Sequence, residues 1–569
     1  MVRVLPDARS LDKAFDYLVP EDLAARVRVG TMVRVPLHGR RVRGWVVEDV
    51  VSPPDGVRLL PLAGVAGEGP PAELVELAEW AAFRWAGPRA AFLRTASPPT
   101  LIRGLPPRPA GASPGDAPSE LLDEVVRAGR AVVRLPPAAD PMDLVAAMAA
   151  RGAVLVVTAS LASAADVVDR LRRLGAAVAH VPAEWARAAA GGCTVVGARA
   201  AAWAPVPALA GAVVVDAHDE ALQEERAPTW SAWRVAAERA ARAGVPCALV
   251  SACPTPEHLA WGRLITLSRN VERAGWPPVV VVDRRREDPR AGLYSGRLVD
   301  LLRRGGPVAC ILNRRGRARL LACAACGELT RCEACGGAVQ QGDAAALSCG
   351  RCGLARPLVC QACGAQRLKT LRVGISRAAE ELAALAGTEV EEVSAATERV
   401  PDRRVLVGTE ALLHRLPARW HGGAVAFLDF DQELLAPRFR AGEQALALLA
   451  RAARAVGPRD AGGQLLVQTR VPGHEVLAGA VHADPGRSSG PEAARRTELR
   501  LPPAVALALV SGPGAAELVA ALPGTVEVLG PDGNCFLVRA PDHQILSFAF
   551  ATTARPSSRV RIEVDPARV

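Results

Sequence analysis

Apolar and polar residues alternate in two short stretches near the N-terminus, Met32–Val35 and Val42–Val47. A period of two is typical of β-strands that bury only one face. Gly30 and Gly44 punctuate these stretches. We therefore expect this part of the chain to form the short strands of a small barrel.

Farther along the chain, apolar runs typical of strands alternate with stretches typical of helices. We predict strands at Val213–Val215 and Val308–Leu312 and a helix at Ser376–Ala386. A further strand is predicted within Val405–Leu413, which reads VLVGTEALL. This alternation predicts α/β domains. The 569 residues suffice for about three or four domains of ~150 residues, and the Pro-, Gly- and Ser-rich stretch 104–120 is predicted to be a linker.

The chain is basic, with a formal charge of +10 and a pI near 9.2. Residues 313–372 contain ten basic and three acidic residues, an excess of seven positive charges on about a tenth of the chain. Phosphate groups are the natural counter-charge for such a segment, so we expect a nucleic-acid partner. The alternative is a solvated loop surface.

The first twenty residues lack the apolar core and the small-residue cleavage site of a signal peptide. No uninterrupted run of about 18 apolar residues occurs, so no membrane-spanning helix is expected. We therefore expect a soluble, cytoplasmic protein. In that compartment, paired Cys-x-x-Cys motifs are more often metal-binding or catalytic than disulfide-forming.

Eight of the thirteen cysteines form four Cys-x-x-Cys pairs. The pairs are Cys323/Cys326, Cys332/Cys335, Cys349/Cys352 and Cys360/Cys363. One pair can hold a metal ion from one side, and tetrahedral zinc needs two pairs, so the pattern predicts two structural Cys₄ zinc sites. A redox motif would come singly, and catalytic zinc would need an open ligand position. Spacing leaves the partners open: neighbouring pairs could share an ion, or the inner two pairs could share one and the outer two the other.

The cysteine-rich segment also resembles a known family. The sequence NRRG at 313–316 is followed by the four cysteine pairs, a helix and VLVGT, an order that resembles the PriA family, primosomal protein N′. These are superfamily-two helicase-like proteins that restart replication at abandoned forks and carry two zinc ions in this insertion. The resemblance implies nested pairing, with the ligand sets Cys323, Cys326, Cys360, Cys363 and Cys332, Cys335, Cys349, Cys352.

The N-terminal stretch resembles the DNA-binding domain with which the family grips the 3′ end of a nascent strand. Phe15, Asp16 and Tyr17 match the Phe-Asp-Tyr motif of that domain, in which the aspartate contacts the terminal base. The alternative for the two aromatic residues is the barrel core. The basic pairs Arg40-Arg41 and Arg314-Arg315 complete the residues expected to contact DNA.

The resemblance extends to the end of the chain and implies a multidomain α/β protein with two degenerate RecA-like helicase lobes. The expected parts are a barrel-like 3′-end DNA-binding domain at 1–103, the linker 104–120, a first lobe at 121–265, a second lobe at 266–480 with the zinc-binding insertion 318–367, and a small α+β C-terminal domain at 481–569.

The elements that an ATPase of this class needs are degraded. Where the family has its phosphate-binding Gly-x-x-x-x-Gly-Lys-Thr loop, residues 131–145 contain Pro136 and Pro137 in the turn and no glycine, lysine or hydroxyl residue. Lys13 and Lys369 are the only lysines of the chain. The metal-binding Asp-Glu-x-His is represented by Asp216, Ala217 and His218. Of the arginine-finger run, two arginines, Arg451 and Arg454, remain, and we expect them on a solvated helix face.

These features predict a protein that recognises stalled forks and helps assemble the primosome for reloading of the replicative helicase, without helicase activity and without catalytic residues. We expect two Zn²⁺ per chain and no ATP or Mg²⁺. The resemblance implies branched DNA, single-strand binding protein and other primosome components or the replicative helicase as partners, no membrane, and a place at the nucleoid. The alternatives are an active ATP-dependent 3′–5′ DNA helicase and a zinc-ribbon module that binds nucleic acid in another process.

Overall fold

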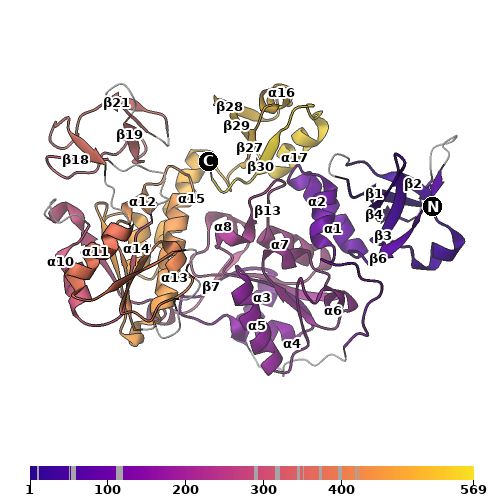
Figure 1. The fold of residues 1–569 in the computed structure, drawn as a ribbon, viewed down its shortest axis with the longest axis horizontal. Coiled ribbons are helices and arrows are strands. Elements are labelled where there is room, and N and C mark those ends of the chain that lie inside the picture. The colour runs from indigo at the N-terminus through magenta and orange to yellow at the C-terminus, as the bar shows by residue number, and fades with distance from the viewer. Residues whose placement is uncertain are drawn as a thin grey trace.

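The computed structural model describes residues 1–568 with several gaps. Left out are residues 9–11, 50, 53–58, 110–118, 288–292, 314–320, 342–345, 350–351, 371–374, 395–396, 398–399, 417–419 and 421. Arg314 and Arg315 therefore lie outside the described residues. Figure 1 shows an N-terminal β domain, two large α/β lobes side by side, a small β module on the second lobe and a C-terminal domain above the first lobe.

The N-terminal domain is a strongly curved sheet with the strand order β5-β2-β1-β4-β3-β6. Its strands are β1 (Val2–Pro6), β2 (Phe15–Leu18), β3 (Met32–Leu37), β4 (Arg40–Glu48), β5 (Leu60–Pro61) and β6 (Gly64–Gly67). The edge strands β5 and β6 are consecutive parts of one segment, so the sheet curls towards a small barrel. His38 and Gly39 join β3 to β4 with φ of 46° and 73°, as a two-residue hairpin turn requires.

The first lobe contains a parallel sheet with the order β15-β7-β14-β11-β8-β10-β9. Its strands are β7 (Arg130–Arg134), β8 (Ala153–Val157), β9 (Val178–His180), β10 (Thr194–Gly197), β11 (Leu209–Val215), β14 (Cys247–Ser251) and β15 (Arg263–Thr266). The helices are α3 (Glu120–Ala128), α4 (Met142–Ala150), α5 (Leu161–Arg173), α6 (Trp185–Ala190), α7 (Ala232–Ala243) and α8 (Pro256–Trp261). The strands are apolar runs because helices cover both faces of a parallel sheet. After β15, helix α9 (Arg269–Ala274) leads into the second lobe.

The second lobe is built around another parallel sheet, with the order β16-β26-β25-β17-β24-β23. The strands are β16 (Val279–Asp283), β17 (Val308–Ile311), β23 (Val390–Val393), β24 (Val405–Gly408), β25 (Ala424–Phe427) and β26 (Gln464–Thr469). The helices are α10 (Gly296–Arg303), α11 (Ile375–Ala386), α12 (Asp431–Leu434), α13 (Ala441–Val456), α14 (Glu475–Val481) and α15 (Gly486–Glu498).

Two smaller β units complete the chain. The cysteine module interrupts the second lobe between β17 and α11 and contains β18 (Leu321–Cys323), β19 (Val339–Gln341), β20 (Ala346–Cys349), β21 (Ala355–Pro357) and β22 (Leu368–Thr370). The C-terminal domain contains β27 (Ala506–Ser511), β28 (Glu527–Asp532), β29 (Cys535–Ala540), β30 (Arg561–Val564), α16 (Ala515–Ala520) and α17 (His543–Thr552). Its antiparallel sheet has the order β28-β29-β27-β30.

One hydrophobic cluster connects three of these parts. Trp85, directly after the N-terminal helix α1 (Ala72–Arg84), and Phe92 of α2 (Arg89–Ala96) are buried. Phe92 packs on Trp203 of the first lobe at 5.5 Å between ring centroids, and the same cluster includes Ala508 of the C-terminal domain. The N-terminal and C-terminal domains are thus docked on the first lobe through a shared core.

The strands and the helix predicted from the apolar pattern all occur. Strands β3, β4, β11, β17 and β24 contain residues of the predicted strand stretches, and α11 covers the predicted helix. The prediction of a multidomain α/β chain is therefore confirmed. Among the described residues, no helix combines the length and the apolar character that crossing a membrane would require.

Candidate functional site

The Phe-Asp-Tyr motif lies on β2, with Tyr17 buried and Phe15 and Asp16 partly buried. Tyr17 is 4% exposed, and its hydroxyl donates a hydrogen bond of 3.2 Å to the carbonyl oxygen of Pro36. Burial raises the pKa of this hydroxyl. Phe15 is half-buried and packs on the same core, with the ammonium group of Lys13 5.8 Å from its ring. Both aromatic residues therefore support the barrel, as the alternative interpretation proposed.

Asp16 has an ion-pair partner that the sequence does not reveal. Arg3 is directly opposite it on β1, and its Nε donates to Asp16 Oδ1 at 2.8 Å. Arg3 also donates to Glu48 at 2.7 Å. A carboxylate can accept about four hydrogen bonds, so the pairing orients Asp16 and leaves it able to accept from a further donor. Only the strand register brings Arg3 and Asp16 together.

Four exposed arginines, here called the arginine stripe, lie along the hairpin of β3 and β4; Arg34, Arg41 and Arg43 share one face, and Arg40 lies beside the turn on the other. Arg40 and Arg41 begin β4 at the turn, and both side chains are exposed. Arg34 and Arg43 face each other across the hairpin and are exposed as well. Within the described part of the chain, none of these four arginines forms an ion pair. Like charges held side by side favour the binding of an anionic partner. Arg34 and Arg43 were not among the DNA-binding residues expected from the sequence, although both occupy polar positions of the predicted strands.

The four Cys-x-x-Cys pairs adopt the same turn. In each, the amide of the following glycine donates to the carbonyl of the first cysteine, at 3.0 Å for Gly327 and Cys323 and at 2.8 Å for Gly364 and Cys360. These glycines have φ between 67° and 76°, a region that favours glycine. The turn directs both thiols of a pair to one side.

The turns combine into two clusters of four sulfur atoms, Cys323, Cys326, Cys360, Cys363 and Cys332, Cys335, Cys349, Cys352. Sulfur atoms from different pairs approach to 3.4–3.6 Å. A disulfide would require about 2.0 Å, whereas four thiolates around zinc at about 2.3 Å are about 3.8 Å apart. The donor set and its spacing therefore fit a tetrahedral, thiolate-binding metal such as zinc. This is the nested grouping.

The turn at 135–139, where the resemblance would expect a phosphate-binding loop, offers no backbone donor. Pro136 and Pro137 have no N–H. The amides of Leu135, Ala138 and Ala139 donate to the carbonyls of Ser251, Gly275 and Pro136 at 3.2, 3.2 and 2.9 Å. All amides of the turn are therefore either absent or already used within the protein.

Asp216 and His218 follow β11 at the edge of the same cleft. Burial favours the neutral acid, but Arg454 outweighs it and lowers the pKa of Asp216 to about 2. The Nδ1 of His218 is 2.9 Å from the hydroxyl of Ser251, and burial lowers the pKa of this imidazole. A carboxylate and a neutral histidine remain, without an acid at position 217 to activate water.

The expectation of a solvated helix face for Arg451 and Arg454 holds only in part: their side chains are 24% and 48% exposed, but each has an ion-pair partner that the sequence did not reveal. Both lie on α13 of the second lobe and reach across the cleft to the first lobe. The guanidinium of Arg454 donates two hydrogen bonds of 2.6 Å to the carboxylate of Asp216 and one of 3.0 Å to the carbonyl of Pro137. Arg451 pairs with Asp219. The helix pattern could not reveal this, because the partners are more than 200 residues away in the chain.

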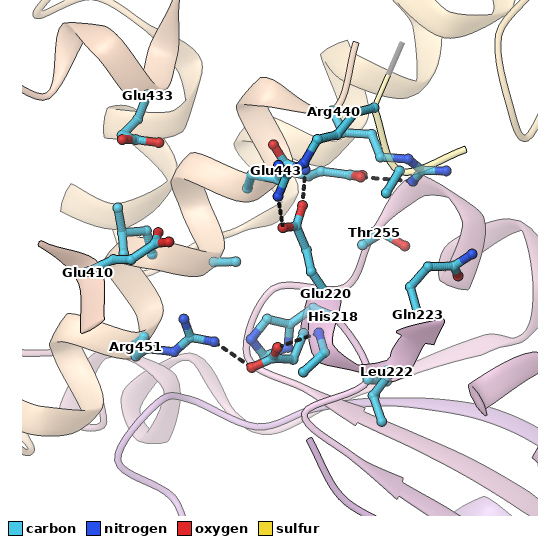
Figure 2. Close-up of a pocket in the computed structure, with 18 of the residues that line it drawn as sticks. His218, Glu220, Leu222, Gln223, Thr255, Glu410, Glu433, Arg440, Glu443 and Arg451 are labelled. Atoms are coloured by element: carbon cyan, nitrogen blue, oxygen red, sulfur yellow. Dashed lines mark hydrogen bonds and ion pairs between the residues drawn. The ribbon is translucent and has the colours of Figure 1, made fainter. Parts of the chain in front are cut away.

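Next to these pairs lies a cavity of about 820 Å³ between the two lobes and the C-terminal tail. Figure 2 shows Arg440 and Arg451 reaching from the second lobe towards the segment that carries His218 and Glu220. Seven carboxylates and five arginines are among its described lining residues. Burial raises the pKa of Glu220 and of Glu443. An excess of carboxylates makes this cavity a poor site for a polyphosphate.

Comparison with known proteins agrees with this geometry. Residues 3–98 match the model of the 3′ DNA-binding domain (3′BD) of PriA. The probable replication restart protein PriA of Mycobacterium leprae (strain TN) is 32% identical, over 92% of this chain and 89% of its own length. This chain belongs to the PriA family.

Other PriA proteins are similar as well. The probable replication restart protein PriA of Mycobacterium tuberculosis (strain CDC 1551 / Oshkosh) is 31% identical over 92% of this chain and 88% of its own. The replication restart protein PriA of Bacillus subtilis (strain 168) is 26% identical over 56% of this chain and 43% of its own. The mycobacterial relatives therefore match the chain through the lobes as well as through the DNA-binding domain.

Proposed function

We propose that this PriA-family protein recognises branched DNA at stalled replication forks and serves as a platform for primosome assembly, without ATP hydrolysis or unwinding. Residues 1–103 bind the 3′ end of the nascent strand, and residues 121–480 form a scaffold derived from a helicase motor. Single-strand binding protein, other primosome components and the replicative helicase are the expected partners, in the cytoplasm at the nucleoid.

The observation that carries this proposal is the exposed arginine stripe on β3 and β4, within the segment that matches the 3′ DNA-binding domain. Four arginines without carboxylate partners among the described residues are free to bind phosphates. Asp16 lies near the far end of β4, because its partner Arg3 is opposite Glu48. Arg3 orients the Asp16 carboxylate, which could still accept a hydrogen bond from the exocyclic amine of a base. Phosphate contacts would position the DNA, and Asp16 would read its end.

The absence of ATP hydrolysis is supported by the geometry of the cleft. A phosphate-binding loop works through free backbone amides and a lysine, and the turn at 135–139 offers neither. The guanidinium of Arg454 is hydrogen-bonded to Asp216 and to the carbonyl of Pro137. It therefore occupies the positions at which an ATPase would bind magnesium and the phosphates. Removal of the phosphate-binding loop or of the magnesium ligand lowers the rate of ATP hydrolysis by orders of magnitude.

The two cysteine clusters are inferred to bind one Zn²⁺ each. Neither would be catalytic, because four thiolates complete the tetrahedral shell. The bound ions would hold together short strands that bury few apolar side chains, and metal binding would thus provide most of the folding free energy of the module. The excess of basic residues in the sequence of 313–372 would supply a second contact with DNA or with partner proteins.

Fork binding tests the proposal. Full-length, zinc-loaded protein is titrated with a fork that has a 3′-hydroxyl end at the junction, with the same fork blocked by a 3′-phosphate, and with linear duplex. The double variant Arg41→Ala/Arg43→Ala should bind forks more weakly and lower the slope of log K against log salt by about two. Arg28→Ala is the matched control, because Arg28 is exposed in the same domain but already pairs with Glu68 at 2.7 Å.

The results distinguish fork recognition by a scaffold from the action of an active helicase. Asp16→Asn should remove the preference for the free 3′-hydroxyl end while leaving the salt slope unchanged. Equal affinity of wild-type protein for forks and linear duplex would refute fork recognition. Hydrolysis of ATP that depends on DNA would refute the scaffold and restore the helicase.

A further inference from the structure

The cleft between the lobes contains arginines where a motor would contain nucleotide. Arg454 contacts the remnants of two ATP-binding elements at once, the carboxylate of Asp216 and the carbonyl of Pro137. Three helical positions earlier, Arg451 pairs with Asp219. Both arginines belong to α13 of the second lobe, and all three partners belong to the first. A positive side chain of the protein thus bridges the lobes at this edge of the cleft.

A second set of charges joins the lobes at the inner end of the cleft. Arg440 precedes α13 and forms an ion pair with Glu257 of the first lobe, at 2.7 Å between nitrogen and oxygen. Arg496 on α15 is 1% exposed and contacts Glu257 at 3.3 Å and Glu443 at 2.9 Å. The arginines lower the pKa of Glu257 although the carboxyl is buried. Separation of the lobes would remove the first-lobe partner of both arginines.

Helix α9, which links the two lobes, is fixed on the second lobe by contacts to backbone. Arg269 of α9 donates to the carbonyls of Ala483 and His482 at 2.7 and 2.8 Å. Arg459, which follows α13, donates to the carbonyl of Arg273 at 3.2 Å. The link between the lobes is therefore held in place by three hydrogen bonds to backbone carbonyls.

We propose that Arg440, Arg451, Arg454 and Arg496, the interlobe clamp, keep the two lobes closed without nucleotide and make the chain a rigid platform that ATP cannot open or close. The proposal rests on the scaffold function proposed above. In a motor, bound nucleotide supplies the charges that draw two lobes together, and its loss lets them separate. Here the charges are covalently part of the chain, so the closed arrangement is its ground state.

The test measures the distance between the lobes in solution. Fluorophores are attached through unnatural amino acids at position 161 on α5 and position 377 on α11, both exposed, so that the cysteines stay unmodified. Single-molecule energy transfer of the full-length, zinc-loaded protein should show one narrow, closed population, unchanged by Mg²⁺-ATP. Arg451→Ala/Arg454→Ala should raise the open population at least tenfold.

Two variants separate the clamp from general destabilisation. Arg242→Ala removes a solvent-exposed ion pair with Glu238 inside the first lobe and should leave the distance unchanged. The charge swap Asp216→Arg/Arg454→Asp should restore most of the closed population that Arg454→Asp alone loses, which a folding defect would not do. Circular dichroism melts verify that each variant is folded at the temperature of measurement.

Each outcome decides something different. An open population in wild-type protein, a distance that changes with Mg²⁺-ATP without hydrolysis, or a double variant as closed as wild type would overturn the clamp and leave fork binding untouched. Hydrolysis of ATP by wild-type protein would overturn the proposed function itself. Closed lobes that open only when the clamp is removed are the expected result.

Discussion

Asp565 near the C-terminus joins three parts of the molecule, and its neutralisation should loosen all three. Its carboxylate accepts from Arg84 of α1 at 2.6 Å, and Arg234 of α7 and His543 of α17 lie at 3.7 and 3.4 Å. Asp565→Asn keeps the size of the side chain. Asparagine also tolerates the positive φ of 54° at this position, so the substitution removes charge without adding backbone strain.

The magnitude follows from burial. The side chains of Arg84 and Asp565 are 10% and 8% exposed, so the variant leaves a buried guanidinium facing a neutral amide. Removal of one partner of a buried pair typically costs about 3–5 kcal/mol. Because about 1.4 kcal/mol corresponds to a factor of ten, amides that exchange through opening of this junction should exchange at least about 100-fold faster.

Hydrogen exchange measured by mass spectrometry reports this opening locally and does not require two-state unfolding of a multidomain chain. The amides of α1 and α17 should lose protection together in Asp565→Asn. Glu238→Gln is the control, because it breaks the exposed pair with Arg242 on α7 and should cost at most about 0.5 kcal/mol. An effect on α1 no larger than that of the control would refute the reasoning. Arg84→Met combined with Asp565→Asn should recover part of the loss, since it removes the unpaired buried charge.

Three further predictions concern metal, pH and nucleotide. Native mass spectrometry should find two zinc ions on the full chain and one on either Cys323→Ser or Cys332→Ser; retention of both ions would contradict the clusters. Burial lowers the pKa of His258 from the usual value near 6.5 to about 3. The imidazole therefore binds a proton more tightly in the unfolded chain, and the protein loses stability as pH falls from about 6.5 towards 3. The free energy of unfolding should therefore decrease by up to about 1.4 kcal/mol per pH unit in urea titrations between pH 7 and 5, and His258→Gln should flatten this dependence. Millimolar Mg²⁺-ATP should leave the melting temperature unchanged, because a ligand stabilises only the state that binds it; a rise of several degrees would show that the cleft accepts nucleotide.

Features that depend on neighbouring residues in the chain were predictable. Period-two alternation located β3 and β4, and apolar runs located β11, β17 and β24. The four cysteine turns follow from Cys-x-x-Cys-Gly, because two thiols and a left-handed glycine suffice to form the turn. The missing phosphate loop was also predictable, since a chain with two lysines, neither after a glycine-rich turn, has no residue to fill that role.

Residue patterns did not reveal which charges meet. Arg3 and Asp16 pair through the register of two antiparallel strands, and a shift by one residue would separate them. Arg454 was expected in solvent because a helix pattern reports only that one face is polar, and it does not report what that face contacts. Asp565 and Arg84 are 481 residues apart, and only the docking of two domains on the first lobe brings them together.

The sequence by itself therefore determined the kinds of local structure and the chemistry that is missing: barrel strands, α/β lobes, cysteine turns, and no lysine for a nucleotide. Cysteine spacing left open how the eight cysteines divide, and the tertiary structure shows the nested clusters that the family resemblance implied. The tertiary structure alone decided which carboxylates face the arginines of the second lobe. The physical reason is the range of the interactions. Backbone hydrogen bonding and apolar periodicity act over a few residues, whereas an ion pair depends on where two distant segments come to lie once their domains have packed.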